Sequence, residues 1–257
     1  MSALDVTIVQ ADLFWQDAVR NREYFTAVIE DLKETTDLIV LPEMFTTGFS
    51  MDAPDLAETM DGASIRWMRE MAASANASVC GSLIIAENQQ FFNRFICASP
   101  SGDLHCYDKH HLFRLAHEQS HYASGESLLT FDLNGWRICP MVCYDLRFPV
   151  WSRNRDSYDL LLYVANWPER RHHAWETLLR ARAIENLSYV AGVNRTGRDG
   201  NDIPYSGGSS IIDYLGEDLA SLGDQAGSAS VELDLEKLAL FRDRFAFHKD
   251  ADNFTLT

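Results

Sequence analysis

The chain has 257 residues, of which 46% are hydrophobic, so it is long enough to bury a full core, and we expect a single domain over residues 1–257. Its 38 Asp and Glu residues outnumber its 22 Lys and Arg residues, which gives a formal net charge of −16. Because no basic run or aromatic RNA-binding motif offsets this charge, nucleic acid and anionic membrane surfaces are excluded as partners.

The first half of the chain has the pattern of alternating strands and helices. A β-branched run at residues 6–9 and an apolar run at 37–41 predict two strands, and apolar residues at helical spacing from Phe25 to Leu32 predict a helix between them. The elements expected next are a helix over 65–75 and strands over 78–86, 91–98 and 103–107, the last two joined by a turn at Ser101-Gly102.

The second half repeats this rhythm. The pair Asn134-Gly135, which is typical of a tight hairpin turn, separates expected strands over 128–133 and 137–142. Alternating helices and near-continuous apolar strands predict an α/β fold, a mixed sandwich with helices outside, and the charged stretch from about residue 235 is expected to be a weakly patterned tail. The other expected elements are a helix after Pro149, a strand over 159–164, a helix over 174–185, a strand over 189–193, and a strand pair, 209–213 and 218–220, that turns at Leu215-Gly216.

The cysteines and the N-terminus indicate the compartment. Five cysteines form an odd number without a C-x-x-C pair, so we interpret them as reduced thiols. The N-terminal residues have no basic segment before their apolar run, which predicts a first strand rather than a signal peptide. No apolar run approaches the roughly 18 residues that a membrane-spanning helix needs. We therefore expect a cytoplasmic protein that does not contact a membrane.

Cys143 lies where an expected strand ends. The segment Cys139-Pro-Met-Val-Cys143-Tyr-Asp-Leu-Arg-Phe-Pro149 runs from apolar into polar and helix-breaking residues, which indicates a sharp turn like the nucleophile elbow of other hydrolases. The alternative is a buried and inert thiol, the more common state of a cysteine with apolar neighbours. Four cysteines fit that alternative: Cys80, Cys97, Cys106 and Cys139.

Two charged residues end other expected strands. Glu43 follows Pro42 at the end of a buried strand, and Lys109 lies where the hairpin strand finishes. Each of these residues alone is more often a solvated or helix-capping side chain. Beside a thiol, however, a carboxylate carries protons and a lysine stabilises a thiolate and a developing oxyanion.

These three segments together resemble the nitrilase superfamily of carbon–nitrogen hydrolases. Leu-Pro-Glu43, Tyr-Asp-Lys109 and Cys143-Tyr-Asp-Leu-Arg-Phe-Pro149 are similar to its three signature segments, in the same chain order, and the resemblance covers about residues 6–212. It implies a four-layer α-β-β-α sandwich with two mixed sheets and a catalytic triad of glutamate, lysine and cysteine. It also implies a second glutamate that orients the lysine, which Glu118 matches by position. No cofactor is implied, and the superfamily forms homo-oligomers.

Within this superfamily the chain is most similar to the omega-amidases, which hydrolyse the terminal amide of 2-oxo acid monoamides such as 2-oxoglutaramate. The resemblance implies a small amide as substrate and a thioester on Cys143, with Glu43 as acid and base, and with Lys109 and the Tyr144 backbone N–H as oxyanion donors. The similarity lies in Leu-Pro-Glu43-Met-Phe-Thr-Thr-Gly-Phe49, Tyr107-Asp-Lys-His-His-Leu-Phe113 and Leu162-Tyr-Val-Ala-Asn-Trp-Pro168.

Family position also predicts the residues that bind the substrate. A carboxylate on the substrate needs a cationic or N–H-rich anchor in so acidic a protein, and Arg147 is a candidate unless an ion pair with Asp145 holds it. The expected pocket residues are Phe45, Tyr144, Arg147, Asn166 and Trp167.

A rival chemistry is present in the same stretch of sequence. His117-Glu118-Gln-Ser-His121 matches the zinc pattern H-E-x-x-H, in which two histidines on one helix face bind the metal and the glutamate is a general base. No third ligand follows at the expected spacing, so we expect no bound metal. Two further alternatives remain: another amidase of the superfamily, acting on N-carbamoyl or aliphatic amides, and a binding protein that keeps only the fold, against which the complete Glu-Lys-Cys set argues.

Overall fold

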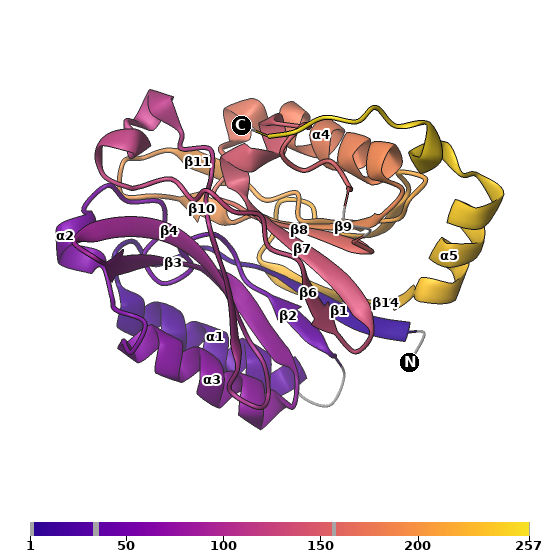
Figure 1. Ribbon diagram of the computed structural model, residues 1–257. Coiled ribbons are helices and arrows are strands. Elements are labelled where there is room, and N and C mark those ends of the chain that lie inside the picture. Colours follow the sequence, from indigo (N-terminus) through magenta and orange to yellow (C-terminus); the bar gives the residue numbers. More distant parts are fainter. Residues whose placement is uncertain (1–2, 33–35, 156–157, 257) are drawn as a thin grey trace.

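The computed structural model describes residues 3–32, 36–155 and 158–256, which form two facing six-stranded sheets (Figure 1). The first sheet consists, in spatial order, of β14 (Gly227–Asp234), β1 (Ala3–Gln10), β2 (Leu38–Val40), β3 (Ser78–Glu87), β4 (Gln90–Ala98) and β5 (Leu104–Asp108). The second consists of β13 (Asp218–Ser221), β12 (Ser210–Ile212), β9 (Tyr189–Val193), β8 (Leu160–Val164), β7 (Trp136–Val142) and β6 (Phe131–Leu133).

Both sheets are mixed. The consecutive strands β1, β2 and β3 are parallel in the first sheet, as are β7, β8 and β9 in the second, and the outer strands of each sheet are antiparallel to their neighbours. The predicted hairpin turn between β6 and β7 is confirmed, because Asn134 and Gly135 have φ angles of 51° and 88°, the left-handed values that a two-residue turn requires.

Helices cover the outer faces of the two sheets (Figure 1). α1 (Ala18–Leu32) and α3 (Ala63–Ala75) lie outside the first sheet, and α4 (His172–Asn186) lies outside the second. This layering confirms the expected four-layer α-β-β-α sandwich. None of the helices in the described ranges is long and apolar enough to cross a membrane. The short elements are α2 (Ala53–Leu56), β10 (Thr196–Arg198) and β11 (Pro204–Ser206).

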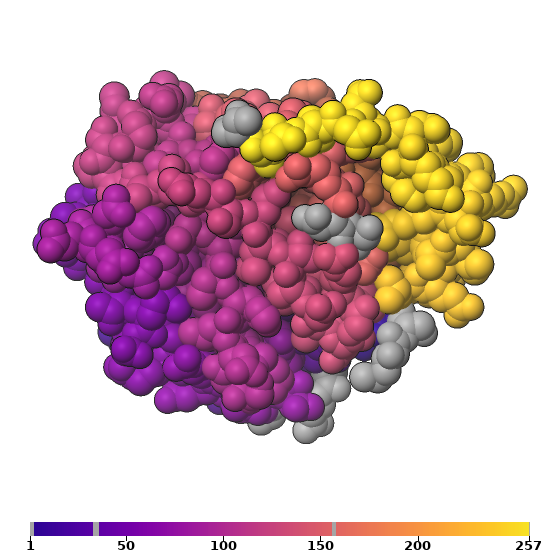
Figure 2. Space-filling model, in the orientation of Figure 1, coloured from indigo at the N-terminus to yellow at the C-terminus, as the bar shows by residue number. Residues whose placement is uncertain are grey.

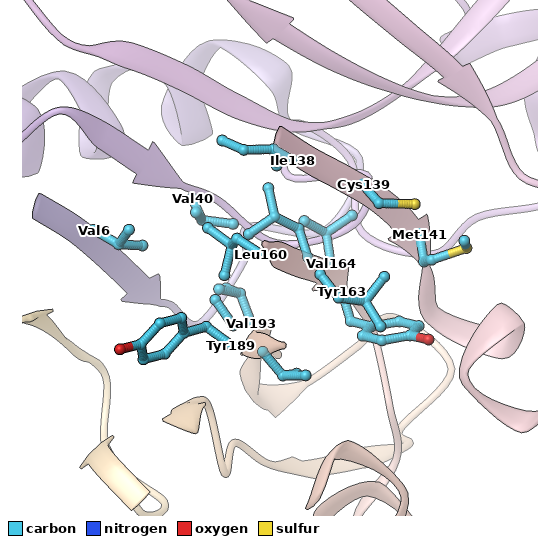
Figure 3. Close-up of a cluster of buried hydrophobic side chains, with 14 of the residues drawn as sticks. Val6, Val40, Ile138, Cys139, Met141, Leu160, Tyr163, Val164, Tyr189 and Val193 are labelled. Carbon is cyan, nitrogen blue, oxygen red and sulfur yellow. The ribbon is translucent and has the colours of Figure 1, made fainter. Parts of the chain in front are cut away.

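Side-chain alternation along the strands divides the core into two layers. On β1, Val6 points into the space between the sheets, where it joins the cluster that includes Ile138 and Leu160 of the second sheet (Figure 3). Val9, also on β1, belongs instead to the layer between the first sheet and its helices, together with Phe25 of α1. Because both faces of the central strands are covered, their sequences are mainly apolar, as in Leu160–Val164 of β8.

The helix predicted after Pro149 is wrong. The chain forms the short 3-10 helix η3 (Cys143–Arg147) before this proline and a turn after it, in which the Trp151 backbone N–H donates to the carbonyl of Phe148 at 3.2 Å. The side chains of Trp151 and Tyr158 are both buried in the core. The conformation of this segment therefore follows the packing of individual aromatic side chains rather than a helical period.

Two elements at the C-terminal end of the chain were not predicted, β14 directly before the charged stretch and α5 (Leu235–Arg244) within it. β14 pairs antiparallel with β1 along its whole length, and α5 is capped by Asp234, whose carboxylate accepts the Lys237 backbone N–H at 2.9 Å. The chain then crosses the surface over the second half of the molecule, and Leu256 packs against the core (Figure 2). β14 has the period-2 alternation of a half-buried edge strand, because Ala229, Val231 and Leu233 pack against the core between exposed or partly exposed polar residues, and the predicted elements left this signal out.

Candidate active site

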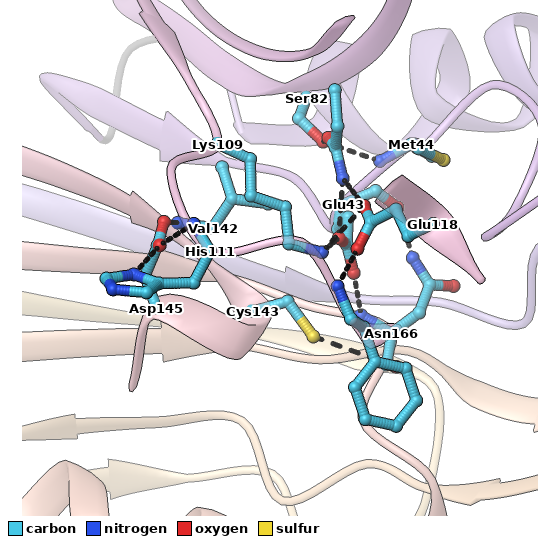
Figure 4. Close-up of polar contacts among 12 residues, drawn as sticks. Glu43, Met44, Ser82, Lys109, His111, Glu118, Val142, Cys143, Asp145 and Asn166 are labelled. Atoms are coloured by element: carbon cyan, nitrogen blue, oxygen red, sulfur yellow. Dashed lines mark hydrogen bonds and ion pairs between the residues drawn. The ribbon is translucent and has the colours of Figure 1, made fainter. Parts of the chain in front are cut away.

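Three strand ends from two sheets meet at one place in the molecule. Glu43 follows β2 and Lys109 follows β5 in the first sheet, whereas Cys143 follows β7 in the second. The structure brings the three side chains together (Figure 4). The carboxyl ends of neighbouring parallel strands all lie at the same end of a sheet. In open α/β folds, side chains that follow these strand ends contact the ligand.

Glu43 is fully buried and is bound on both of its carboxylate oxygens. Oε1 accepts hydrogen bonds from Lys109 Nζ at 2.9 Å and from Asn93 Nδ2 at 2.7 Å. Oε2 accepts the backbone N–H of Asn166 at 2.7 Å. A buried carboxylate with these donors has one conformation, so its position relative to Cys143 is fixed before any substrate binds.

Lys109 lies between two carboxylates. Its Nζ donates to Glu43 Oε1 at 2.9 Å and to Glu118 Oε1 at 3.0 Å, and all three side chains are almost completely buried. Burial works against the charged ammonium group, but the charges of Glu118 and Glu43 outweigh it and hold the pKa of Lys109 well above its usual value. The lysine therefore stays charged at neutral pH.

Glu118 is the glutamate that the resemblance expected beside the lysine. Burial and the neighbouring charge of Glu43 raise its pKa, and Lys109 opposes the shift. Its second oxygen, Oε2, accepts the backbone N–H of Phe113 at 2.5 Å. These contacts on two oxygens fix the carboxylate, which in turn fixes the direction of the lysine side chain.

Cys143 adopts a strained backbone conformation at the start of η3. Its φ angle is 45°, a value that costs a non-glycine residue about 1–3 kcal/mol and that is typical of functional positions. The predicted sharp turn is therefore present. Sγ lies 3.9 Å from the carbonyl oxygen of Asn166, and burial, followed by the charge of Glu43, raises the pKa of the thiol well above its usual value although Lys109 lowers it. Cys143 is thus a neutral thiol that needs a base to become a nucleophile.

Asp145 holds η3 in place. It is completely buried and accepts hydrogen bonds from the Tyr107 hydroxyl at 2.8 Å, from the backbone N–H of His111 at 2.9 Å and from that of Val142 at 3.1 Å. The ion pair with Arg147 that we considered from the sequence is wrong, because these donors occupy Asp145, and no such pair occurs in the described ranges.

A pocket of about 360 Å³ opens above the cysteine, a volume within the range of small-molecule sites. Tyr144, Arg147, Asn166 and Trp167 line it, as expected. Phe45 does not line it, and this expectation is wrong. The Phe45 ring packs in the core between α1 and α3, 5.6 Å from Phe25 and 5.5 Å from Trp67. Phe49 lines the pocket instead, with its ring 5.1 Å from Lys109 Nζ.

Comparison with known proteins agrees with this geometry. A family model described as carbon-nitrogen hydrolase matches residues 5–243. The chain belongs to the carbon–nitrogen hydrolase family. Omega-amidase YafV of Yersinia enterocolitica is 48% identical with 100% of both chains covered, and 2-oxoglutaramate amidase of Bacillus subtilis is 32% identical, covering 95% of this chain and 96% of its own.

A solved structure extends this likeness to three dimensions. XC1258 of Xanthomonas campestris, described as a CN-hydrolase superfamily protein with an arsenic adduct in its active site, is 46% identical over 100% of both chains with a TM-score of 0.98. A carbon-nitrogen hydrolase of Helicobacter pylori shares the fold at 21% identity, with a TM-score of 0.89 and coverage of 97% and 95%. The recognition of the superfamily from three short segments is therefore confirmed.

The segment of this carbon–nitrogen hydrolase that matches the zinc pattern, residues 117–121, does not have the geometry of a zinc site. Residues 118–120 are a 3-10 turn rather than an α-helix, His117 has a φ angle of 57°, and the side chains of both His117 and His121 are exposed while Glu118 points inward to Lys109. Within residues 3–32, 36–155 and 158–256, three or more His, Cys, Asp or Glu side chains nowhere gather closely enough to hold a metal ion.

One buried polar pair of this hydrolase, Ser82 and Asn93, was not among the predicted site residues. Ser82 Oγ accepts the Met44 backbone N–H at 2.8 Å, so its own hydrogen is free to donate to Asn93 Oδ1, also at 2.8 Å. This bond fixes the Asn93 amide with its NH2 group toward Glu43, at 2.7 Å, and Glu118, at 3.4 Å. The signal in the sequence is an asparagine in the middle of an apolar strand, where an unpaired polar side chain is costly.

Proposed function

We propose that this carbon–nitrogen hydrolase cleaves the terminal amide of short 2-oxo acid monoamides, such as 2-oxoglutaramate and 2-oxosuccinamate, to the acid and ammonia. The names of its relatives, omega-amidase and 2-oxoglutaramate amidase, support this substrate class. One structural observation carries the chemistry. A neutral thiol, Cys143, lies at the base of a small pocket beside a buried carboxylate and a buried ammonium group, Glu43 and Lys109.

In the acylation half of the proposed reaction, Glu43 removes the proton from Cys143 as the sulfur attacks the amide carbon. The carbonyl oxygen becomes an oxyanion, which Lys109 Nζ and the Tyr144 backbone N–H stabilise, since the first N–H groups of a helix such as η3 have no partner within the helix. Glu43 then gives its proton to the nitrogen, the carbon–nitrogen bond breaks, and ammonia leaves a thioester on Cys143.

The deacylation half returns the enzyme to its starting state. Glu43, again a carboxylate, takes a proton from a water molecule that attacks the thioester carbon, and the same donors stabilise the second oxyanion. The carbon–sulfur bond breaks, the thiolate takes the proton back from Glu43, and the carboxylic acid leaves. Lys109 keeps its proton throughout, which agrees with its raised pKa.

Ammonia release across a set of amides tests the substrate class. We expect turnover of 2-oxoglutaramate and 2-oxosuccinamate with kcat/KM well above that for N-carbamoyl amino acids and unbranched aliphatic amides. The reaction is run with purified protein and compared with Cys143→Ala. If N-carbamoyl or simple aliphatic amides are hydrolysed and both 2-oxo acid monoamides are not, the chain belongs to another branch of the family and this proposal fails.

We also propose a homo-oligomer, at least a dimer. In support, Ile184 on α4 is 51% exposed and Val150, in the turn after η3, is 55% exposed, so large apolar side chains face outward on both segments. Sedimentation velocity at micromolar concentration should give at least twice the chain mass. Ile184→Glu should shift the protein toward the monomer, whereas Leu240→Glu on α5 should not. A wild-type monomer with full activity contradicts this assignment.

The compartment and domain organisation are proposals of the same kind. The cysteines, Cys143 included, form no disulfide within the described parts of the chain, which supports a reducing cytoplasm as the site of action. One cluster of buried side chains extends from Leu4 on β1 to Leu238 on α5, which supports a single domain. Cell fractionation tests the first proposal, and a single cooperative unfolding transition is expected from the second.

A further inference from the structure

Besides the exposed Arg170, two guanidinium groups line the active-site pocket without a carboxylate partner in the described parts of the chain. Arg147 lies over the Trp167 ring and Arg171 over the Phe113 ring, each with its guanidinium carbon 4.9 Å from the ring centroid. Both arginines are partly buried. They come from different elements, since Arg147 ends η3 and Arg171 ends the short helix η4 (Glu169–Arg171).

Several other buried or partly buried arginines in this protein form ion pairs. Arg94 binds Asp108 at 2.7 Å, and the pairs Arg195–Asp12 and Arg242–Asp159 are similarly short, at 2.9 Å and 2.7 Å. Acidic side chains are plentiful, because the formal net charge is −16. Two partly buried arginines that lack such a partner at a pocket are therefore a local excess of positive charge that an anion would compensate.

Arg171 is built into the wall of the pocket. Its backbone carbonyl accepts the Trp167 indole N–H at 2.8 Å, and the ring beneath its guanidinium belongs to Phe113, whose backbone N–H binds Glu118. The side chain is thus held by residues next to the catalytic network. Burial lowers the pKa of Arg171, and the positive charges of Arg170 and Arg147 act in the same direction, while Cys143 opposes them.

The acidic residues of the pocket do not neutralise this pair. Asp199 accepts hydrogen bonds from the Tyr205 hydroxyl at 3.0 Å and from two backbone N–H groups, those of Asn201 and Ile203. Asp52 is exposed and accepts a hydrogen bond from the side-chain amide of Gln16 at 2.6 Å. Both carboxylates are thus engaged by neutral donors rather than by the arginines.

We propose that Arg171 is a specificity-determining residue, which binds the carboxylate of the substrate jointly with Arg147 and so directs the amide end toward Cys143. This inference rests on the proposed function and adds to it the residue that selects an anionic amide. Two guanidinium groups on aromatic supports present planar donors to one carboxylate, an arrangement that favours a short acid monoamide over a neutral amide of equal length.

Kinetics with a matched pair of substrates test the role of Arg171. Glutaramate and pentanamide have five carbons each and differ in the terminal carboxylate, so the ratio of their kcat/KM values measures selection of the anion. For Arg171→Gln we expect this ratio to fall by about 10-fold or more, mainly through KM for glutaramate. Arg171→Lys should recover part of it. Arg114→Gln, an exposed arginine outside the pocket lining, should leave the ratio unchanged.

Binding to the inactive enzyme gives a second readout that does not depend on turnover. Cys143→Ala is titrated with glutaramate by calorimetry, with and without Arg171→Gln, and we expect Kd to rise by about 10-fold or more. If Arg171→Gln lowers kcat/KM equally for both substrates and leaves Kd unchanged, Arg171 has only a structural role. If it changes neither kcat/KM value, Arg171 takes no part in recognition. Both results overturn the inference. A wild-type enzyme that hydrolyses neutral amides but no acid monoamide overturns the proposed function instead.

Discussion

Glu43 and Asn166 join the two sheets at the active site. The Asn166 backbone N–H donates to Glu43 Oε2 at 2.7 Å, and the Asn166 side-chain amide donates to the backbone carbonyl of Glu43 at 2.5 Å. Glu43 follows β2 of the first sheet and Asn166 follows β8 of the second. Since the Asn166 carbonyl also contacts Cys143 Sγ, this one residue sets the position of the carboxylate relative to the thiol.

Replacement of the nucleophile should abolish ammonia release. We expect Cys143→Ala to lower kcat by at least about 10³-fold, because no other side chain at the base of the pocket forms a thioester. Cys106→Ala is the control, since Cys106 is exposed, not buried as the sequence suggested, and lies outside the pocket lining. Turnover is measured by ammonia release, and folding by circular dichroism. An active Cys143→Ala enzyme would contradict the thioester mechanism.

The two charged partners of Cys143 should shift its ionisation in opposite directions. Burial is the main cause of the raised thiol pKa, the charge of Glu43 adds to it, and that of Lys109 opposes it. Glu43→Gln should therefore lower the Cys143 pKa and increase the thiolate fraction at neutral pH, whereas Lys109→Met should raise the pKa further. The ultraviolet absorbance of the thiolate, followed against pH, measures both changes.

Despite opposite effects on the thiol, both variants should lose turnover. Glu43→Gln removes the proton carrier, which is worth about 10²–10⁴-fold, and Lys109→Met removes an oxyanion donor, which is worth about 10²–10³-fold. If Glu43→Gln keeps near-normal kcat, the acid and base assignment is wrong, and Glu118 becomes the next candidate for that role.

Asn93 should act on catalysis through Glu43 without touching the substrate. Asn93→Ala removes the donor at 2.7 Å from Glu43 Oε1, so we expect kcat to fall by about 10-fold or more with little change in KM. Gln90→Ala, an exposed amide on the same strand, is the control. A simple loss of folded protein, with kcat per folded molecule unchanged, would mean that Asn93 has only a structural role.

Chelators should leave the activity intact. The inward-pointing Glu118 is held by Lys109 and Phe113, and the side chains of His117 and His121 are exposed on a 3-10 turn, so the three residues are not arranged to bind zinc. Elemental analysis should find no stoichiometric zinc. His117→Asn, which tolerates the left-handed backbone at this position, should keep full turnover. One zinc per chain that is lost together with activity would restore the metal hypothesis.

Phe45 should contribute to stability rather than to substrate binding. Its side chain is completely buried between Phe25 and Trp67, so Phe45→Ala should lower the free energy of unfolding by about 3–5 kcal/mol while KM stays close to that of the wild type. Urea unfolding measures the first effect and steady-state kinetics the second. Phe247→Ala, at a side chain that is 60% exposed, should change the stability little. A large rise in KM for the Phe45 variant would return this residue to the pocket.

Much of the fold was predictable because local patterns coincide with the layers. Strands with continuous apolar residues are those covered on both faces, and the Asn134-Gly135 turn follows from local backbone preference. The pairing of β14 was not predictable in this way. Its apolar and polar residues alternate, as in any half-buried strand, but its partner β1 lies more than 200 positions earlier in the chain, and only the tertiary structure joins the two.

For the site, the sequence by itself determined which residue types end the strands. Glu43, Lys109 and Cys143 each follow a predicted strand, and their order along the chain carries the resemblance to the family. Only the tertiary structure decided their partners. It placed Asn93 against Glu43, and it gave Arg171 no carboxylate partner among residues 3–32, 36–155 and 158–256.

The exchange of Phe45 for Phe49 at the pocket has the same origin. The two phenylalanines are four positions apart in one loop, and the loop turns at Met44 through a φ angle of 43°. One ring therefore packs under the helices and the other faces the lysine. Local sequence sets the hydrophobicity of each residue, but the direction of a side chain in a loop depends on contacts with residues that are distant in the chain, and only the packed structure contains those contacts.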